Sequence, residues 1–396
     1  MRVAKTGDPK KSAVRFIVLL GTVSLFADVT YEGARSINGP YLGMLGASAV
    51  VVGAVAGLGE FIGHALRLVS GLLSDRTRRY WVLLITGYTV NLLAVPALAL
   101  AGRWEMAAGL MILERVGKAI RAPARDVLLS GAARRIGTGW GFGLHEALDQ
   151  IGALTGPLVL AAVLGYGGGY RMCYAVLLVP AFMALSVLTA AKLSYGQPGN
   201  SFETVSQKTS ARNLPRAFWL YLAASGLMAA GFADFPLIAF HLGKAGIVKE
   251  ATVPLFYALA MGVDALAALA FGRFFDRHGI PSLVAAAIVS AAATPFLFLG
   301  AGGAVVLGVV FWGVGLGAQE SVMRAAVAEM VPTERRGSAY GIFGTAFGLC
   351  WFLGSAAMGL LYTSSPKLLV VFAVVAQLAA IPFLLGSRKP LATSKT

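Results

Sequence analysis

Long apolar runs separated by short polar segments make up most of the chain. A helix needs about 20 predominantly apolar residues to cross the hydrocarbon core of a bilayer, and most of these runs approach that length. Because the runs are continuous and do not alternate between apolar and polar positions over short segments, strands are not expected. The pattern predicts twelve transmembrane helices, at about residues 14–37, 48–73, 80–101, 105–130, 139–164, 170–192, 216–240, 252–274, 280–299, 303–328, 338–361 and 366–386.

One long polar stretch interrupts this series. Residues 194–215 are rich in Ser, Thr, Gln, Asn and Gly, and such a composition cannot bury a core. We interpret this stretch as a cytoplasmic linker. It divides the chain into an N-terminal bundle of six helices at residues 1–193 and a C-terminal bundle of six helices at residues 216–396. The expected fold class is therefore an all-α integral membrane protein.

Short motifs recur in the two halves in the same order. A Gly-x-x-x-Asp-Arg motif follows the second predicted helix and also the eighth, at Gly71, Asp75 and Arg76 and again at Gly272, Asp276 and Arg277. The tripeptide Phe-Ala-Asp ends at Asp28 in the first predicted helix and at Asp234 in the seventh. Secondary transporters are commonly built from internal repeats, so we expect two pseudo-symmetric bundles.

The composition supports a membrane protein. Charged residues make up 13% of the chain, whereas soluble domains carry roughly 25%. A net charge of +15 could indicate a nucleic-acid partner, but the Lys and Arg residues gather in alternate connecting segments. The positive-inside rule then places both termini in the cytoplasm and leaves few basic residues on the other side, namely Arg103, Arg171, Lys244, Lys249 and Lys367. We expect a multi-pass monomer of the plasma (inner) membrane, with the lipid bilayer and a small-molecule substrate as partners and no nucleic acid.

These motifs resemble those of a known family. Gly-x-x-x-Asp-Arg followed by basic residues is similar to the loop signature of the major facilitator superfamily, and Arg115 resembles the arginine element of its fourth helix. The stretch from Gly152 to Gly156 and Pro157 resembles the Gly-Pro element of the fifth helix in its antiporter and drug-efflux branches. The resemblance implies two six-helix bundles that rock about a cavity at mid-membrane. It also implies a gating role for this element and for both loop motifs.

Charged residues inside the predicted helices follow helical spacing. An unpaired charge in a bilayer costs at least about 2.5–3.5 kcal/mol, so charges there indicate either an ion-pair partner or a functional role. Positions i, i+4 and i+7 hold charged or titratable groups in three helices of the first half, at Asp28, Glu32 and Arg35, at Glu60, His64 and Arg67, and at Glu114, Lys118 and Arg121. Acids and bases nearly cancel, and we expect them to pair within the first bundle.

A buried carboxylate beside movable basic groups can change its affinity for protons as a cavity changes faces. The candidate proton-coupling residues are Asp28, Glu60, His64, Glu146 and Asp149. The candidate substrate-cavity residues are Tyr31, Glu32, Arg35, Arg67, Glu114, Arg115, Lys118, Arg121, Asp234, Asp264 and Glu320. The structural alternative is that these charges form ion pairs that only hold helices together. We favour that alternative for Arg125 and Asp126, which together with Asp75 and Arg76 would latch a cytoplasmic gate.

The second half is poorer in charge than the first and offers mainly aromatic side chains inside its predicted helices. Polar contacts from one half and apolar contacts from the other fit an amphipathic organic solute. The sequence has no phosphate-binding Gly-x-x-x-x-Gly-Lys-Ser/Thr loop and no Cys/His cluster with metal-site spacing, so we expect no cofactor beyond an ion gradient, taken to be protons.

The function expected from these observations is secondary transport of a small organic solute by alternating access, through proton-coupled efflux (antiport), and not an enzymatic activity. Two alternatives stay open. The basic face of residues 114–125 also fits proton-coupled uptake of an anionic metabolite. The same charges could instead form the active site of a membrane-embedded enzyme that modifies lipids.

Overall fold

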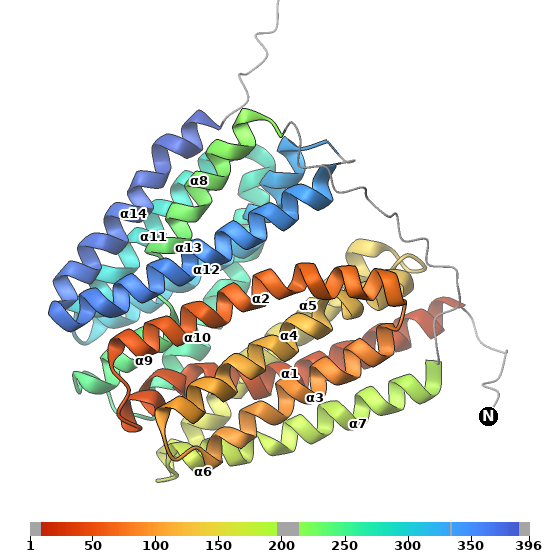
Figure 1. Ribbon diagram of the computed structural model, residues 1–396, viewed down its shortest axis with the longest axis horizontal. Coiled ribbons are helices and arrows are strands. Elements are labelled where there is room, and N and C mark those ends of the chain that lie inside the picture. Colours follow the sequence, from red (N-terminus) through yellow and green to blue (C-terminus); the bar gives the residue numbers. More distant parts are fainter. Residues whose placement is uncertain (1–8, 196–213, 333–334, 388–396) are drawn as a thin grey trace, which may run out of the picture. The chain divides into compact units, whose positions relative to one another are not determined.

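The computed structural model describes residues 9–195, 214–332 and 335–387, and within these ranges the chain is helical without strands (Figure 1). This confirms the predicted all-α fold class. The helices are α1 (Pro9–Met44), α2 (Ala49–Thr77), α3 (Tyr80–Ala97), α4 (Trp104–Ala133), α5 (Thr138–Gly165), α6 (Tyr170–Val176), α7 (Leu178–Tyr195), α8 (Arg216–Gly231), α9 (Phe235–Lys244), α10 (Thr252–His278), α11 (Ile280–Leu299), α12 (Gly303–Met330), α13 (Arg336–Ser364) and α14 (Pro366–Gly386). A 3-10 turn at Leu98–Leu100 follows α3.

Eleven helical segments in the described part of the chain are long and apolar enough to cross a membrane, with α6 and α7 forming one segment and α8 and α9 another. The one predicted helix that is not among these eleven segments is that at residues 105–130, which corresponds to α4. At 30 residues it is long enough to span a bilayer, because a helix rises about 1.5 Å per residue. It is not among the eleven because charged side chains lie along most of its length, from Glu105 to Asp126.

The chain forms two compact units. Unit 1 comprises residues 1–48, 58–206 and 235–261, and unit 2 comprises residues 49–57, 207–234 and 262–396. Unit 1 therefore holds α1, most of α2, α3 to α7, α9 and the start of α10. Of the predicted linker at residues 194–215, residues 196–213 lie outside the described residues, and the predicted domain boundaries stay a prediction.

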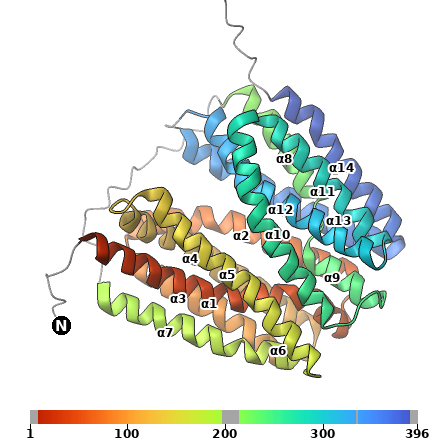
Figure 2. The same ribbon diagram turned by 180° about the vertical axis from the view of Figure 1, so that it is seen from behind.

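Within unit 1, α1 is the central helix and packs against α5, α7 and α9, while α3 packs against α4 (Figure 2). Glycines allow the closest of these contacts. A Cβ atom at Gly156 of α5 would lie 2.9 Å from the backbone nitrogen of Gly33 in α1, and one at Gly152 would lie 2.9 Å from Cβ of Asp28. The Gly-Pro element of the sequence is thus a helix-packing surface that sets the position of Asp28.

We expect Gly156→Val to destabilise unit 1, because the added side chain would meet the backbone of α1 at Val29 and Gly33. Overpacking of this kind costs about 1–3 kcal/mol. Thermal unfolding of the purified protein in detergent measures the effect. The matched control is Gly143→Ala in the same helix, where an added Cβ has nothing within 4 Å. Equal melting temperatures for the two variants would contradict the packing role.

Unit 2 is built on α11 packed against α12 and α14, with α8 against α13 and α14. The predicted helix at residues 216–240 is interrupted at residues 232–234, between α8 and α9. Backbone groups freed by such a break must find partners in a membrane. The carbonyl of Gly231 accepts a hydrogen bond from Nε2 of Gln377 at 2.9 Å, and that of Ala233 accepts one from Nε1 of Trp312 at 2.8 Å. Side chains of α14 and α12 therefore hold the break in place.

Candidate functional site

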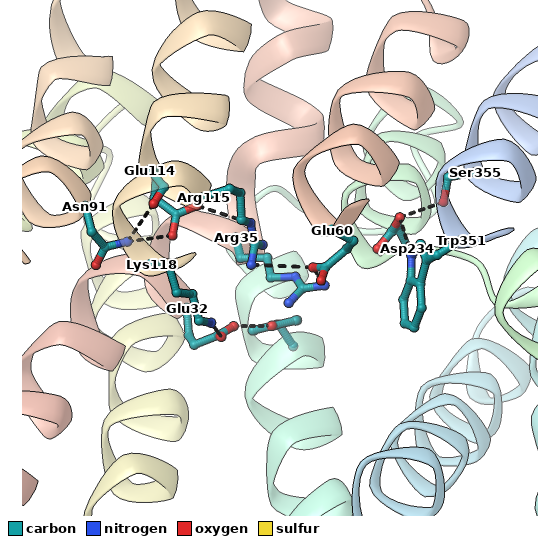
Figure 3. Close-up of polar contacts among 11 residues, drawn as sticks. Glu32, Arg35, Glu60, Asn91, Glu114, Arg115, Lys118, Asp234, Trp351 and Ser355 are labelled. Carbon is teal, nitrogen blue, oxygen red and sulfur yellow. Dashed lines mark hydrogen bonds and ion pairs between the residues drawn. The ribbon is translucent and has the colours of Figure 1, made fainter. Parts of the chain in front are cut away.

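The charged faces of α1, α2 and α4 meet in unit 1 (Figure 3). The carboxylate of Glu60 on α2 receives a guanidinium from each of the other two helices, with Nη2 of Arg35 at 2.9 Å and Nη1 of Arg115 at 3.4 Å. These side chains are less than 20% exposed. Two guanidiniums on one carboxylate join three helices at a single point.

Further pairs extend this group along α4. Nε of Arg115 lies 3.2 Å from Glu114, whose carboxylate also accepts a hydrogen bond from Nδ2 of Asn91 at 2.7 Å. Nζ of Lys118 lies 3.7 Å from Glu32, and the hydroxyl of Tyr257 donates to the same carboxylate. We call the six charged residues of this group the paired cluster: Glu32, Arg35, Glu60, Glu114, Arg115 and Lys118. Each of its three acids and three bases has a direct ion pair, so the cluster is neutral.

A second group lies between α1, α3, α4 and α5, and we call it the aspartate–arginine cluster: Asp28, Arg121, Arg125, His145 and Asp149. Arg125 contacts Asp126 at 3.0 Å and Asp149 at 3.6 Å. Nδ1 of His145 lies 3.4 Å from Asp149, while its Nε2 shares a hydrogen bond with Ser24 at 3.1 Å. The sequence assigned Arg125 to the gate, yet the structure joins it to a candidate proton-coupling residue.

Asp28 and Arg121 are the least paired members of this second cluster. They are 6% and 1% exposed, and neither forms an ion pair with any residue that the structure describes. Asp28 interacts electrostatically with Lys118, Glu32 and Arg121, and with Asp149 across the α1–α5 contact. The guanidinium of Arg121 lies over two tyrosine rings, 4.2 Å from the centre of Tyr88 and 5.6 Å from that of Tyr31.

The predicted proton-coupling residues are thus divided between the two clusters. Asp28 and Asp149 belong to the aspartate–arginine cluster, and Glu60 belongs to the paired cluster, where His64 is one of its electrostatic neighbours. Glu146 is exposed on α5. Of the predicted cavity residues on the same helices, Tyr31 lies beneath the ammonium group of Lys118 at 3.9 Å, and Arg67 is half-buried on α2.

The predicted gating residues are more scattered. Gly71 faces Pro123 of α4, 3.9 Å from where its Cβ would stand, whereas an added Cβ at Gly272 would meet open space. The side chain of Asp75 lies outside the described residues. Among the described side chains, three further gating residues are exposed and form no ion pair: Arg76, Asp276 and Arg277.

Unit 2 holds the remaining predicted cavity residues. Asp234 is buried and accepts hydrogen bonds from Nε1 of Trp351 at 2.9 Å and from the hydroxyl of Ser355 at 2.7 Å (Figure 3). Asp264 is buried on α10 beside Gly317, while Glu320 is exposed on α12. The carboxylate of Asp234 therefore accepts hydrogen bonds from two neutral donors.

Sequence reasoning missed the neutral partners of these charges, above all Tyr88 and Asn91 on α3 and Trp351 and Ser355 on α13. Asn91 is the one that the sequence could have indicated most easily, because an amide inside an otherwise apolar run requires a hydrogen-bond partner. Among the described residues, no group of three or more His, Cys, Asp or Glu could hold a metal ion.

The family model described as Major Facilitator Superfamily matches residues 20–355 and 235–395. An uncharacterized protein of Mycobacterium tuberculosis is 44% identical over 389 residues, which cover 96% of this chain and 95% of that protein. An uncharacterized MFS-type transporter of Methanocaldococcus jannaschii is 23% identical over 379 residues, or 94% of each chain. The crystal structure of a mutant of the nucleoside transporter NupG aligns with a TM-score of 0.76 at 13% identity, covering 94% of this chain and 100% of that one.

Proposed function

Because this chain belongs to the major facilitator superfamily, a family of membrane transporters, we propose that it moves a small organic solute across the membrane in a cycle coupled to protons. The chain is a multi-pass membrane transporter and not an enzyme. The lipid-modifying alternative is therefore set aside.

The observation that carries proton coupling is a pair of carboxylates in the aspartate–arginine cluster, namely Asp28, which is buried, and Asp149, whose side chain is 14% exposed. Asp28 and Asp149 interact with each other across the contact of α1 with α5, and both interact with Arg121. Two carboxylates that share a site repel each other when both are ionised, and a proton on either removes the repulsion. We assign the proton to this pair of carboxylates.

Glu60 is a weaker candidate for the proton than its place in the sequence suggested. Its carboxylate holds the guanidiniums of Arg35 and Arg115, and protonation would deprive both of their shared acceptor. We propose that the paired cluster fixes α1, α2 and α4 relative to one another within unit 1. The aspartate–arginine cluster binds and releases the proton.

The two candidate directions of transport differ in what supports them. Export was predicted from the Gly-Pro element of α5, but its glycines are explained by packing against α1 whichever way the solute moves. Export therefore stays a prediction. Uptake of an anionic solute is the second candidate, and the buried guanidinium of Arg121 favours it.

The test uses the purified full-length chain in proteoliposomes with a pH-sensitive dye inside. A thermal-shift screen of amino acids, nucleosides, organic acids and organic amines first identifies solutes that stabilise the protein, since a ligand raises stability by mass action. An imposed pH gradient should then drive solute flux, opposite to the protons for export and with them for uptake. Flux that is identical with and without the gradient would contradict proton coupling.

A further inference from the structure

Arg121 has hydrogen-bonding capacity that the described part of the protein leaves unused. A guanidinium carries five N–H donors and stays charged. Arg121 is 1% exposed, yet it makes no hydrogen bond or ion pair with any described residue, and its Nε is a buried donor without an acceptor. A buried donor left without an acceptor costs about 1–3 kcal/mol, more when it is charged. The site is therefore short of an acceptor, which something other than the described side chains must supply.

The other cations on α4 do not share this property. Arg115 pairs with Glu60 and Glu114, Lys118 pairs with Glu32, and Arg125 pairs with Asp126 and Asp149. The sequence offered Arg115, Lys118 and Arg121 equally as partners for an anion. In the structure, carboxylates pair with Arg115 and Lys118, whereas none of the described carboxylates forms an ion pair with Arg121.

The described contacts of Arg121 are with aromatic rings and do not use its N–H donors. The guanidinium centre lies over the ring of Tyr88, 4.2 Å from the ring centre. Cation–π contacts stabilise the charge but do not accept the in-plane N–H groups. Those N–H groups form a fork that matches the two oxygens of a carboxylate or phosphate.

Packing of α3 on α4 fixes where this fork stands. A Cβ atom at Gly87 would lie 2.7 Å from both Cβ and the backbone nitrogen of Arg121. Only glycine at this position lets α3 approach so closely. The base of the Arg121 side chain is thus held by backbone, which is the preorganisation that a binding group needs.

We propose that Arg121 is the receptor for an anionic group, a carboxylate or a phosphate, on the transported solute. This inference rests on the proposed function, because it places the solute in the same cluster as the proton. The titratable and charged groups that surround Arg121 come from four helices: Asp28 and Tyr31 on α1, Tyr88 on α3, Arg125 on α4, and His145 and Asp149 on α5.

Proton binding and anion binding are then linked. Ionised Asp28 and Asp149 neutralise the field of Arg121 and repel an incoming anion, whereas a proton on either carboxylate removes that repulsion. Each ligand strengthens the other by the same factor, as linkage requires. The anion should therefore bind more tightly at acidic pH than at neutral pH.

Anion binding to the full-length protein in detergent tests the proposal without any gradient. The probes are inorganic phosphate, benzoate as the carboxylate, and choline as a cationic comparison, each titrated calorimetrically. We expect the wild type to bind phosphate or benzoate but not choline. Binding of only one of the two anions assigns the solute to that chemical class, and both results support the site.

The decisive variant is Arg121→Lys, which keeps the charge and is expected to fold, with Arg121→Gln as its neutral companion. Loss of the bidentate fork should weaken anion binding about tenfold or more in the lysine variant, a change of ~1.4 kcal/mol. The matched control, Arg103→Gln, removes an exposed arginine just before α4 and should bind as the wild type does.

Wild-type affinity in Arg121→Lys, or no anion binding by the wild type, would overturn the assignment. Proton-coupled flux that persists in that case leaves the proposed function intact. Anion binding that depends on Arg121 but comes without proton-coupled flux would support the anion site and contradict the proposed proton coupling.

Discussion

Proteoliposomes that contain the Asp28→Asn variant are expected to lose nearly all solute-driven proton movement. Asparagine keeps the size of the side chain and cannot take up or release a proton. Asp28 is 6% exposed, and its position is set by the close approach of Gly152, so the amide should occupy the same place. Counterflow exchange of labelled solute, which needs no net proton transfer, should survive. The expected change is a fall in coupled flux of about 100-fold, comparable with the loss of a positioned acid–base group.

Asp149→Asn should reduce proton-coupled flux less than Asp28→Asn does, because Arg125 and His145 remain beside the amide. The double variant should be no worse than Asp28→Asn if the two carboxylates share one proton, as we propose. Glu105→Gln, at an exposed position in the first turn of α4, is the matched control and should transport as the wild type does. Coupled flux that is normal in both aspartate variants would show that the proton resides elsewhere.

Glu60→Ala should have the largest effect on stability. It removes the carboxylate that holds Arg35 and Arg115 from two different helices. Breaking a buried pair by deleting one partner costs about 3–5 kcal/mol, because charge is left behind without compensation. Glu60→Gln keeps an acceptor oxygen for the guanidiniums and should lose less. The fall in melting temperature in detergent, read beside the yield of monodisperse protein, measures both variants.

Two comparisons make this prediction specific. Glu105→Ala deletes an exposed carboxylate and should leave the melting temperature close to that of the wild type, as surface substitutions generally do. Combining Glu60→Ala with Arg35→Ala should restore part of the lost stability, because one of the two guanidiniums is then removed as well. Equal melting temperatures for Glu60→Ala and Glu105→Ala would mean that the paired cluster does not hold the helices.

The positions of the membrane helices could be predicted from the sequence because burial in lipid demands long apolar runs. The helices extend beyond those runs, as α1 does from Pro9 to Met44, since polar residues at a helix end can stay helical in the headgroup region. The break at residues 232–234 was not predicted. It depends on Trp312 and Gln377 from distant helices, and hydropathy does not register such partners.

The sequence predicts which charged residues share a helix face, but it does not predict which residues of other helices they pair with. Helical spacing places Lys118 and Arg121 on one face of α4 but does not say which helix stands opposite each of them. That depends on how α1, α3 and α5 are rotated, and neutral residues of α3 contribute to it. Tyr88 covers Arg121, and Asn91 binds Glu114, so two uncharged side chains distinguish cations that look alike in the sequence.

The charge density of α4 also bears on how the protein is made. Each charged side chain at the centre of a lone helix opposes insertion from the translocon by about 2.5–3.5 kcal/mol, so α4 released singly would be rejected by the bilayer. Contact with α3, through Gly87 against Gly117 and Asn91 against Glu114, would lower the cost of inserting α4 into the bilayer. The two helices are adjacent in the chain and can enter as a hairpin once α1 and α2 have supplied the acids. We therefore expect α3 and α4 to insert together during synthesis, after α1 and α2.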